Sequence, residues 1–310
     1  MKRYFIGPKQ KTIENTNFFD GSITLFGDNS KNNISYHKEL CFEYWDPDNN
    51  NREIDFYNSV LNGFTEEIEL MAHNPHLVSK CQLPKNIKQI CLNNQELLNI
   101  LDNKIKTREL LRGQVPMLTY YNVLGSEFKF KNFSHLAKKI VVQLPEGSGG
   151  AKTFLYDKTN EKHIIEKMKK NETYTVSAYQ PNNIPYNIHC VISKSQIIIF
   201  PPSEQDLEIT DKIEYIGSKY DIIINEDVKS KIQEYSKIIC SKLQQLGYLG
   251  VLGIDYIYAN SELYFIEINP RFQGSTVQLD KILKNHNLPS IFEYNYNAFN
   301  NSPLKVPNLF

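Results

Sequence analysis

The sequence predicts an α+β protein in which β-hairpins and helices form separate layers. Three observations lead to this fold class. Hairpin-like pairs of strands dominate the second half of the chain, a glycine-rich segment connects strand-like runs at residues 139–144 and 153–156, and residues 226–246 have the period of one long amphipathic helix that ends at Gly247. Because strands and helices alternate only in part, we expect layered α+β packing rather than one doubly wound parallel sheet.

In the first third of the chain, short strand-like runs are mixed with helical stretches. Residues 22–26 are predicted to form a strand and residues 53–71 a helix. Asn94 stands where an N-cap is expected, and the helical pattern after it covers residues 95–112 before Gly113 stops it. We therefore expect one continuous helix to lead into the second part of the chain.

The glycine-rich segment, residues 146–150 with the sequence EGSGG, joins two strands instead of a strand and a helix. It lacks the Lys-Ser/Thr ending of a P-loop and does not match G-x-G-x-x-G. Such a hairpin can still fold over phosphates and donate backbone N–H groups, because no Cβ blocks the approach. Ser148 would add a hydroxyl donor and Lys152 a charge. An ordinary flexible turn explains the same glycines, and taken alone the segment leaves both interpretations open.

The last predicted hairpin carries the most informative residues. Residues 253–258 and 263–268 are rich in β-branched and aromatic side chains, with Asn-Ser-Glu between them as turn material. A hairpin closed through those three residues places Asp255 opposite Glu267. Asn269 lies on the same face as Glu267, because side chains two apart in a strand share a face. Mg²⁺ prefers oxygen ligands of this kind together with phosphate oxygens, so the hairpin end is a candidate Mg²⁺–nucleotide site.

Two residues follow this hairpin. Pro270 ends the strand because it has no N–H for the ladder, and Arg271 supplies a fixed, planar positive charge suited to phosphate or carboxylate. An ordinary hairpin with one wet, charged face also explains the acids when they are taken alone. The central strands are predicted at residues 174–180, 187–192 and 196–200.

Composition excludes several classes of function. With 310 residues the chain can bury a large core, and 35 Lys+Arg balance 35 Asp+Glu, so net charge gives no attraction to nucleic acid or to an anionic membrane. No apolar run is long enough to span a bilayer. The five cysteines are dispersed and form no C-x-x-C pair, which favours a reducing, cytoplasmic compartment over a disulfide framework. They are Cys41, Cys81, Cys91, Cys190 and Cys240.

Taken in order along the chain, these motifs resemble the ATP-grasp superfamily. The residues that carry the resemblance are Asp102-Asn103-Lys104 in the helix, the glycine-rich hairpin, and the final hairpin with Ile254-Asp255 and Glu267-Ile268-Asn269-Pro270-Arg271. The resemblance implies an ATP-grasp fold, in which two α+β subdomains grip ATP, behind an α/β pre-ATP-grasp domain. It implies domains at residues 1–100 and 101–310, the second divided into a glycine-loop subdomain (101–176) and a larger Mg²⁺/ATP subdomain (177–310).

Within the superfamily the sequence is most similar to ligase-like proteins of natural-product pathways. The segments that carry this likeness are residues 142–150, 201–205, 215–218 and 271–276. The resemblance implies that Asp255, Glu267 and Asn269 hold Mg²⁺ and that Arg271 steadies the transferred phosphate or the acyl intermediate. The residues that it implies for nucleotide binding are Lys104, Gln143, Gly147, Ser148, Gly149, Gly150, Ser177, Ala178, Tyr179, Gln180, Asn187 and His189.

One residue departs from the family pattern. Many ATP-grasp enzymes have a lysine in the strand before the glycine loop, where this chain has Gln143, which can form hydrogen bonds but carries no charge. Lys104 or Lys152 is a candidate for the missing charge. His189, in an Ile-rich strand, is either a nucleotide contact or a core histidine. Ser203 and Gln205 either face the acceptor pocket or cap loop backbone groups.

The resemblance implies a ligase with ATP and Mg²⁺ as cofactors. A small-molecule carboxylate would attack the γ-phosphoryl group of ATP, and an amine, such as that of an amino acid or peptide, would then displace phosphate to form an amide. The alternatives are a hydroxyl acceptor, a thiol on a carrier protein, direct phosphoryl transfer, and a nucleotide-binding regulatory module without turnover. Gln143 favours the last alternative and the complete acid hairpin argues against it. Both a monomer and a homodimer stay open.

Overall fold

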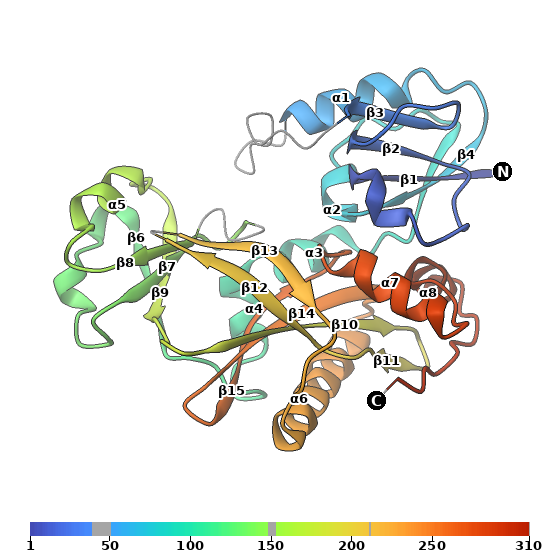
Figure 1. Ribbon diagram of the computed structural model, residues 1–310. Coiled ribbons are helices and arrows are strands. Elements are labelled where there is room, and N and C mark those ends of the chain that lie inside the picture. Colours follow the sequence, from blue (N-terminus) through green and yellow to red (C-terminus); the bar gives the residue numbers. More distant parts are fainter. Residues whose placement is uncertain (39–50, 148–152, 211, 310) are drawn as a thin grey trace.

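The computed structural model describes residues 1–38, 51–147, 153–210 and 212–309. Within these ranges the chain forms three β-sheets, seen in Figure 1 as an N-terminal sheet, a small sheet at the far end and a larger sheet between them. None of the helices in this part of the chain has the length and apolar character needed to cross a membrane. The α+β character that the sequence predicts is present, with a parallel sheet first and antiparallel sheets after it.

The N-terminal sheet is parallel, with strand order β3-β2-β1-β4-β5. Its strands are β1 (Lys2–Lys9), β2 (Gly21–Phe26), β3 (Asn33–His37), β4 (Ile68–Ala72) and β5 (Ile87–Ile90). The connecting helices are η1 (Gln10–Ile13), α1 (Asn51–Leu61) and α2 (Pro75–Val78). The strand predicted at residues 22–26 is confirmed as β2.

The helix predicted over residues 53–71 is wrong in its second half. Helix α1 ends at Leu61, and Ile68–Ala72 forms the buried strand β4 between β1 and β5. A parallel strand buried on both faces is a nearly continuous apolar run without alternation, so its periodicity resembles that of a buried helix. Burial in the sheet therefore decides that this segment is a strand and not a helix.

The helix predicted over residues 95–112 is also wrong, because it is two helices. Asn94 caps α3 (Gln95–Leu101) as expected, accepting hydrogen bonds from the N–H groups of Glu96 and Leu97. The chain then turns at Asn103, whose side chain accepts from the N–H of Lys106 and begins α4 (Lys104–Leu110). Asn side chains compete for backbone groups in this way, which makes them good caps and poor helix-interior residues.

The small sheet is antiparallel, with strand order β6-β9-β7-β8. Its elements are β6 (Tyr120–Leu124), η2 (Gly125–Glu127), η3 (Phe130–Asn132), β7 (Ile140–Gln143), β8 (Thr153–Tyr156), α5 (Glu161–Lys167) and β9 (Thr173–Ala178). Buried aromatic rings fill its core, with Phe130 stacked on Tyr156. The predicted hairpin is confirmed, with Gln143 opposite Thr153. The glycine-rich segment connects these two strands.

The large sheet is antiparallel, with order β13-β12-β10-β14-β15 and β11 beside β10. Its strands are β10 (Ile184–Ile192), β11 (Ile197–Ile199), β12 (Ser203–Ile209), β13 (Ile213–Lys219), β14 (Gly250–Ala259) and β15 (Glu262–Asn269). The predicted long helix is confirmed as α6 (Glu226–Gln245), capped by Asn225. It packs on the face that includes Leu252, while α7 (Thr276–Asn285) and α8 (Ile291–Phe299) pack on the face that includes Val251.

One buried core joins the N-terminal sheet to the large sheet. Phe5 of β1 and Met71 of β4 lie in the same cluster as Val251 of β14 and Phe292 of α8. The rings of Phe5 and Phe292 make edge contact at 5.8 Å between centroids. The N-terminal sheet therefore rests against the α7–α8 side of the large sheet, as Figure 1 shows.

Asp280, on α7, gives a testable link between burial and stability. Its Oδ1 atom accepts a hydrogen bond from the N–H of Ile291 at 2.9 Å, and its buried Oδ2 atom has no partner among the described residues. Burial raises the pKa of Asp280 to about 6. Because this value lies above that of the unfolded chain, the carboxyl contributes stability below about pH 4, and that contribution is lost as the pH rises through 6.

Replacing Asp280 with asparagine should therefore stabilise the protein at pH 8, by about 2 kcal/mol, and change little at pH 4. Chemical denaturation of both proteins at the two pH values measures this difference. An equal effect at both pH values would contradict the assigned titration, since only the ionised carboxylate carries the desolvation cost.

Candidate functional site

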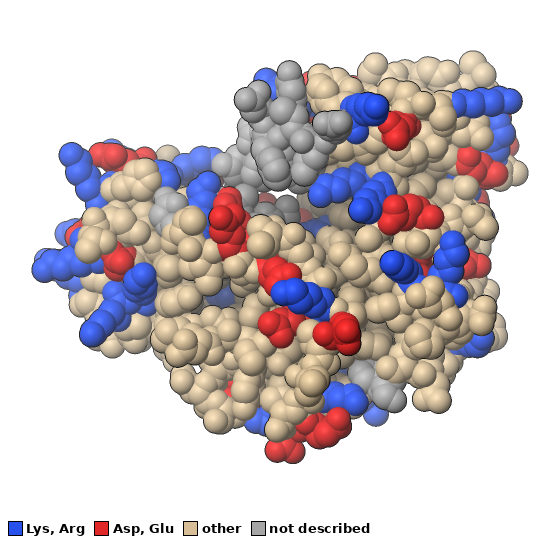
Figure 2. Space-filling view, viewed as in Figure 1, with Lys and Arg blue, Asp and Glu red and all other residues tan. Residues whose placement is uncertain are grey.

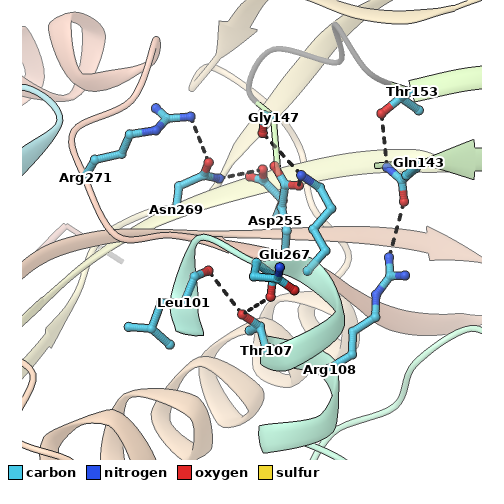
Figure 3. Close-up of polar contacts among 12 residues, drawn as sticks. Leu101, Thr107, Arg108, Gln143, Gly147, Thr153, Asp255, Glu267, Asn269 and Arg271 are labelled. Carbon is cyan, nitrogen blue, oxygen red and sulfur yellow. Dashed lines mark hydrogen bonds and ion pairs between the residues drawn. The ribbon is translucent and has the colours of Figure 1, made fainter. Parts of the chain in front are cut away.

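The candidate site lies where three elements meet: the open end of hairpin β14–β15, the N-terminal turn of α4 and the base of hairpin β7–β8. Figure 3 shows Asp255, Glu267, Asn269 and Arg271 near one another, with Arg108, Gln143 and Thr153 on the other side. On the face drawn in Figure 2, basic and acidic side chains are intermingled, in keeping with the zero net charge of the chain.

The pairing of Asp255 with Glu267 is confirmed, although the turn that produces it is tighter than expected. Asn260 and Ser261 both have positive φ (52° and 63°) and form a two-residue turn, so that Glu262 pairs with Ala259. A bulge next to Asp255 then shifts the register by one residue. This bulge restores the alignment in which the two acids face each other, as bulges near functional sites often do.

The Asp255 carboxylate is held by three side-chain amides. Its Oδ1 atom accepts from Asn187 at 2.5 Å and from Gln205 at 3.3 Å, and its Oδ2 atom accepts from Asn269 at 2.9 Å. Burial first, and then the neighbouring Glu267 carboxylate, raise the pKa of Asp255 to about 7. Two carboxylates that face each other in a partly buried place repel, so the pair has a strong tendency to take up a proton or a cation.

Glu267 has a cationic partner. The ammonium of Lys104 lies 2.8 Å from its Oε2 atom, and both side chains are mostly buried, with 10% and 19% of their surfaces exposed. Burial alone would raise the pKa of Glu267, but Lys104 and then Arg271 hold it below its usual value. Lys104 Nζ also donates to the carbonyl of Gly147 at 3.2 Å, so it links the acid hairpin to the start of the glycine-rich segment.

Arg271 lies at the boundary between the large sheet and the N-terminal sheet. Its guanidinium donates to Asn269 Oδ1 at 3.0 Å and to the carbonyl of Phe272 at 3.0 Å. The N–H of Phe272 in turn donates to the carbonyl of His73, just after β4. Burial, and then the Arg271 charge, lower the pKa of His73 to about 3. His73 is therefore neutral at neutral pH and adds no positive charge beside Arg271.

Gln143 lies at the end of β7 and is bound on both sides. Its Nε2 atom donates to Thr153 Oγ1 at 3.2 Å, and its Oε1 atom accepts from Arg108 at 3.3 Å. Arg108 is only 5% exposed and its guanidinium lies over the ring of Tyr120, 5.2 Å from the centroid. Burial lowers the pKa of Arg108. A second cation thus lies beside Lys104, contributed by a residue that the sequence analysis did not select.

The predicted adenine hinge connects the two antiparallel sheets. Ser177 and Ala178 end β9, and Tyr179 donates its N–H to the carbonyl of Lys139. Gln180 lies further on, where its Oε1 atom accepts from Asn260 at the tip of the β14–β15 hairpin, 2.9 Å away. Gln180 is therefore at the opposite end of that hairpin from the two acids, and its place in the nucleotide set remains a prediction.

Asn187 and His189 lie behind the acids and make their contacts inside the protein. In the β10–β14 register Asn187 is opposite Asp255, and its amide donates to that carboxylate and to Gln273. His189 is fully buried, with its ring nitrogens 3.0 Å from Thr276 Oγ1 and 3.3 Å from the Tyr220 hydroxyl. This environment fits the core histidine of the two interpretations that the sequence leaves open.

Polar side chains, most of them amides, pack around Asp255. Gln205 contacts the carboxylate directly, while Ser203 is buried with its hydroxyl 3.4 Å from the carbonyl of Asn187. Gln273 lies across Gly253, where a Cβ would come within 1.6 Å of its Nε2 atom. Gly253 is thus required for this close approach, which accounts for the glycine beside Ile254 in the hairpin motif.

Several of the predicted residues cannot be placed. Ser148, Gly149, Gly150 and Lys152 lie outside the described residues, as does Cys41. The four other cysteines are free thiols. Of the predicted glycine segment, the described part is Glu146 and Gly147, and both are exposed. The carbonyl of Gly147 accepts a hydrogen bond from the Lys104 ammonium.

The residues present fit Mg²⁺ and a nucleotide. Asp255, Glu267 and Asn269 offer carboxylate and amide oxygens at the open end of the β14–β15 hairpin. Burial and the facing Glu267 carboxylate raise the pKa of Asp255, which favours the uptake of a cation there. Lys104, Arg108 and Arg271 surround the pair with three cations, which suits an anion as large as a polyphosphate. The spacing of Arg108 from Lys104 could have identified it, because residues four apart on a helix lie on the same face.

Comparisons with known proteins identify the family and the fold. A family model described as the ATP-grasp domain matches residues 101–275. No curated protein sequence matches the chain. Among solved structures, the ADP complex of an N5-carboxyaminoimidazole ribonucleotide synthetase aligns with a TM-score of 0.67 at 16% identity, covering 99% of this chain and 79% of the other. 

Two further structures are similar. An L-amino acid ligase from Bacillus licheniformis has a TM-score of 0.63 at 13% identity, covering 96% of this chain and 74% of its own. A carboxyaminoimidazole ribonucleotide synthase from Aspergillus clavatus, complexed with ATP, has a TM-score of 0.63 at 15% identity, covering 99% and 79%. At these identities the likeness concerns the fold, and the ATP-grasp fold that the sequence predicts is confirmed.

Proposed function

This chain belongs to the ATP-grasp family of ATP-dependent ligases, and from that premise we propose that it activates a carboxylate as an acyl phosphate and joins it to an amine. The family uses ATP and Mg²⁺ as cofactors. The observation that carries the proposal is the pair of facing carboxylates, Asp255 and Glu267. Glu267 lies 2.8 Å from the Lys104 ammonium, and Asn269 and Arg271 flank the pair.

In the first step, an oxygen of the substrate carboxylate forms a bond to the γ-phosphorus of ATP while the β–γ bridging bond breaks and ADP leaves. Mg²⁺, when held by Asp255, Glu267 and Asn269, supplies neutralisation of phosphate charge. Arg271 donates hydrogen bonds to the oxygens on which charge develops, and Lys104 keeps Glu267 ionised and oriented. The protein acts by positioning and by charge, as is general for phosphoryl transfer.

In the second step, the amine nitrogen bonds to the acyl carbon and phosphate leaves with the electron pair of the broken C–O bond. The amine gives up a proton to phosphate or solvent, and the product is an amide. In this proposal Arg271 stays with the phosphate through both steps, and its hydrogen bond to Asn269 supports that role. That Ser148, Gly149 and Gly150 cover the phosphates stays a prediction, because these residues lie outside the described part of the chain.

The substrate class is an extension from a similar structure. One of the solved structures that this chain resembles is an L-amino acid ligase, and we propose amino acids or short peptides as both acid and amine. The natural-product subgroup, the amine as acceptor in place of a carrier thiol, the homodimer and the cytoplasmic compartment stay predictions. So does the division at residues 100 and 176, although the small sheet ends with β9 at Ala178.

Incubation with ATP, Mg²⁺ and an amino-acid mixture tests the reaction. We expect ADP and phosphate to appear together with a product whose mass equals acid plus amine minus water. Mass spectrometry identifies the product, and omission of the amine should suppress net turnover. A thioester or ester product would show that the acceptor is a thiol or a hydroxyl and not an amine. Absence of ATP turnover with any acceptor would contradict the ligase and favour a regulatory module.

A further inference from the structure

Arg108 is a buried cation that forms no ion pair within the described part of the chain. It is 5% exposed, and its Nη1 atom has no hydrogen-bond partner among the described residues. Its other recorded contacts are the neutral Gln143 amide and the ring of Tyr120. The carboxylate of Glu267 acts on it through space, but that carboxylate is in contact with Lys104. A buried charge that is left unpaired is costly, so its retention calls for a partner that arrives from outside.

The position of Arg108 identifies the kind of partner. It lies one helical turn after Lys104 on α4 and contacts Gln143, the last residue of β7. Lys104 contacts Gly147 on the segment that leaves this strand, so Arg108 lies beneath the start of the glycine-rich segment (Figure 3). Lys104 is already engaged by Glu267 and Gly147, whereas the Nη1 atom of Arg108 is available. 

We propose that Arg108 binds the phosphates of the nucleotide, donating from Nη1 to a diphosphate oxygen while Gln143 holds its Nη2 in place. This proposal rests on the ATP-dependent function and names a phosphate contact for the same site. The charge count supports it: three cations and two carboxylates leave the described site with a positive excess that suits a polyphosphate. The planar guanidinium fork also fits phosphate geometry better than an ammonium does.

The test compares a ligand with phosphates and a ligand without them. Arg108→Met keeps most of the apolar stem and removes the charge. We expect its affinity for Mg²⁺–ADP, measured by calorimetry, to fall about tenfold to a hundredfold, and its affinity for adenosine to stay unchanged. Arg112→Met is the matched control, because Arg112 lies on the same stretch, is 68% exposed and pairs with Glu109.

A second variant keeps the proposal testable if Arg108→Met does not fold. Gln143→Glu places a carboxylate at the amide oxygen that Arg108 already contacts at 3.3 Å. This internal anion should raise the melting temperature of the ligand-free protein and weaken Mg²⁺–ADP binding, because it competes with phosphate for Arg108. A lower melting temperature for Gln143→Glu would overturn the proposal, because Arg108 would then already be paired.

Binding separates this inference from the ligase function. If the unaltered protein binds Mg²⁺–ADP and Arg108→Met binds it equally well, or loses adenosine to the same degree, the phosphate role of Arg108 is wrong and the ligase function still stands. If the unaltered protein binds neither nucleotide nor Mg²⁺, the ATP-dependent function itself fails, and the phosphate contact fails with it.

Discussion

Replacement of Glu267 by glutamine is expected to lower the rate of ATP-dependent ligation by about 10²–10³ while the protein still folds. Glutamine keeps an oxygen that can accept from Lys104, which lies 2.8 Å from the present carboxylate. It removes the negative charge on which the proposed Mg²⁺ site depends. We also expect the Mg²⁺ concentration needed for half-maximal rate to rise. Steady-state kinetics across a Mg²⁺ titration measures both effects.

The matched control for Glu267→Gln is Glu262→Gln. Glu262 begins the same strand, but it lies beside the turn and pairs with Lys231 at 3.1 Å. Loss of that partly exposed ion pair, which lies away from the two facing acids, should cost little stability and leave turnover unchanged. Near-normal ligation by Glu267→Gln, with the same Mg²⁺ requirement as the control, would remove Glu267 from the site.

Replacement of Arg271 by alanine should lower kcat by about 10²–10³ and change KM for ATP much less. The reason is that, in the proposed mechanism, Arg271 meets the charge that develops during transfer. Loss of an interaction made only in the transition state lowers kcat and kcat/KM together. Arg271→Lys should recover part of the rate, because it keeps the charge but loses the fork that reaches Asn269 and the Phe272 carbonyl.

Arg112→Ala serves as the control for charge in general, since Arg112 is an exposed arginine on the surface beyond α4. Its turnover should match the unaltered protein. An Arg271→Ala variant that raised KM alone would mean that Arg271 binds ground-state ATP, and its assignment to the transferred phosphate would be wrong.

The sequence predicts the acid hairpin well because its signals are local. Turn residues, strand-forming side chains and the two-residue period place Asp255 opposite Glu267, and the structure confirms that pairing. The sequence pattern does not predict the tight turn at Asn260 and Ser261 or the bulge that compensates for it. The cap at Asn94 and the long helix α6 are local signals of the same kind.

Other elements were decided by burial and by contacts between distant segments. Strand β4 has the apolar run of a helix and becomes a strand because it lies inside a parallel sheet. The break at Asn103 separates α3 from α4 and is held by the Thr107 hydroxyl, which lies within hydrogen-bonding distance of the carbonyls of Ile100 and Leu101. This break sets the position of Lys104 at a helix start, facing Glu267.

By itself, the sequence determined that Asp255, Glu267 and Asn269 share one face of the last hairpin, because short-range periodicity fixes that face. Their role as Mg²⁺ ligands stays a prediction. The tertiary structure alone decided what surrounds them. It placed Lys104 against Glu267, 163 positions away in the numbering, and Arg108 against Gln143. Such contacts join segments that are far apart in the sequence and meet only when whole sheets pack together. This packing also decides which residue lies beside a buried charge, and no local sequence pattern encodes it.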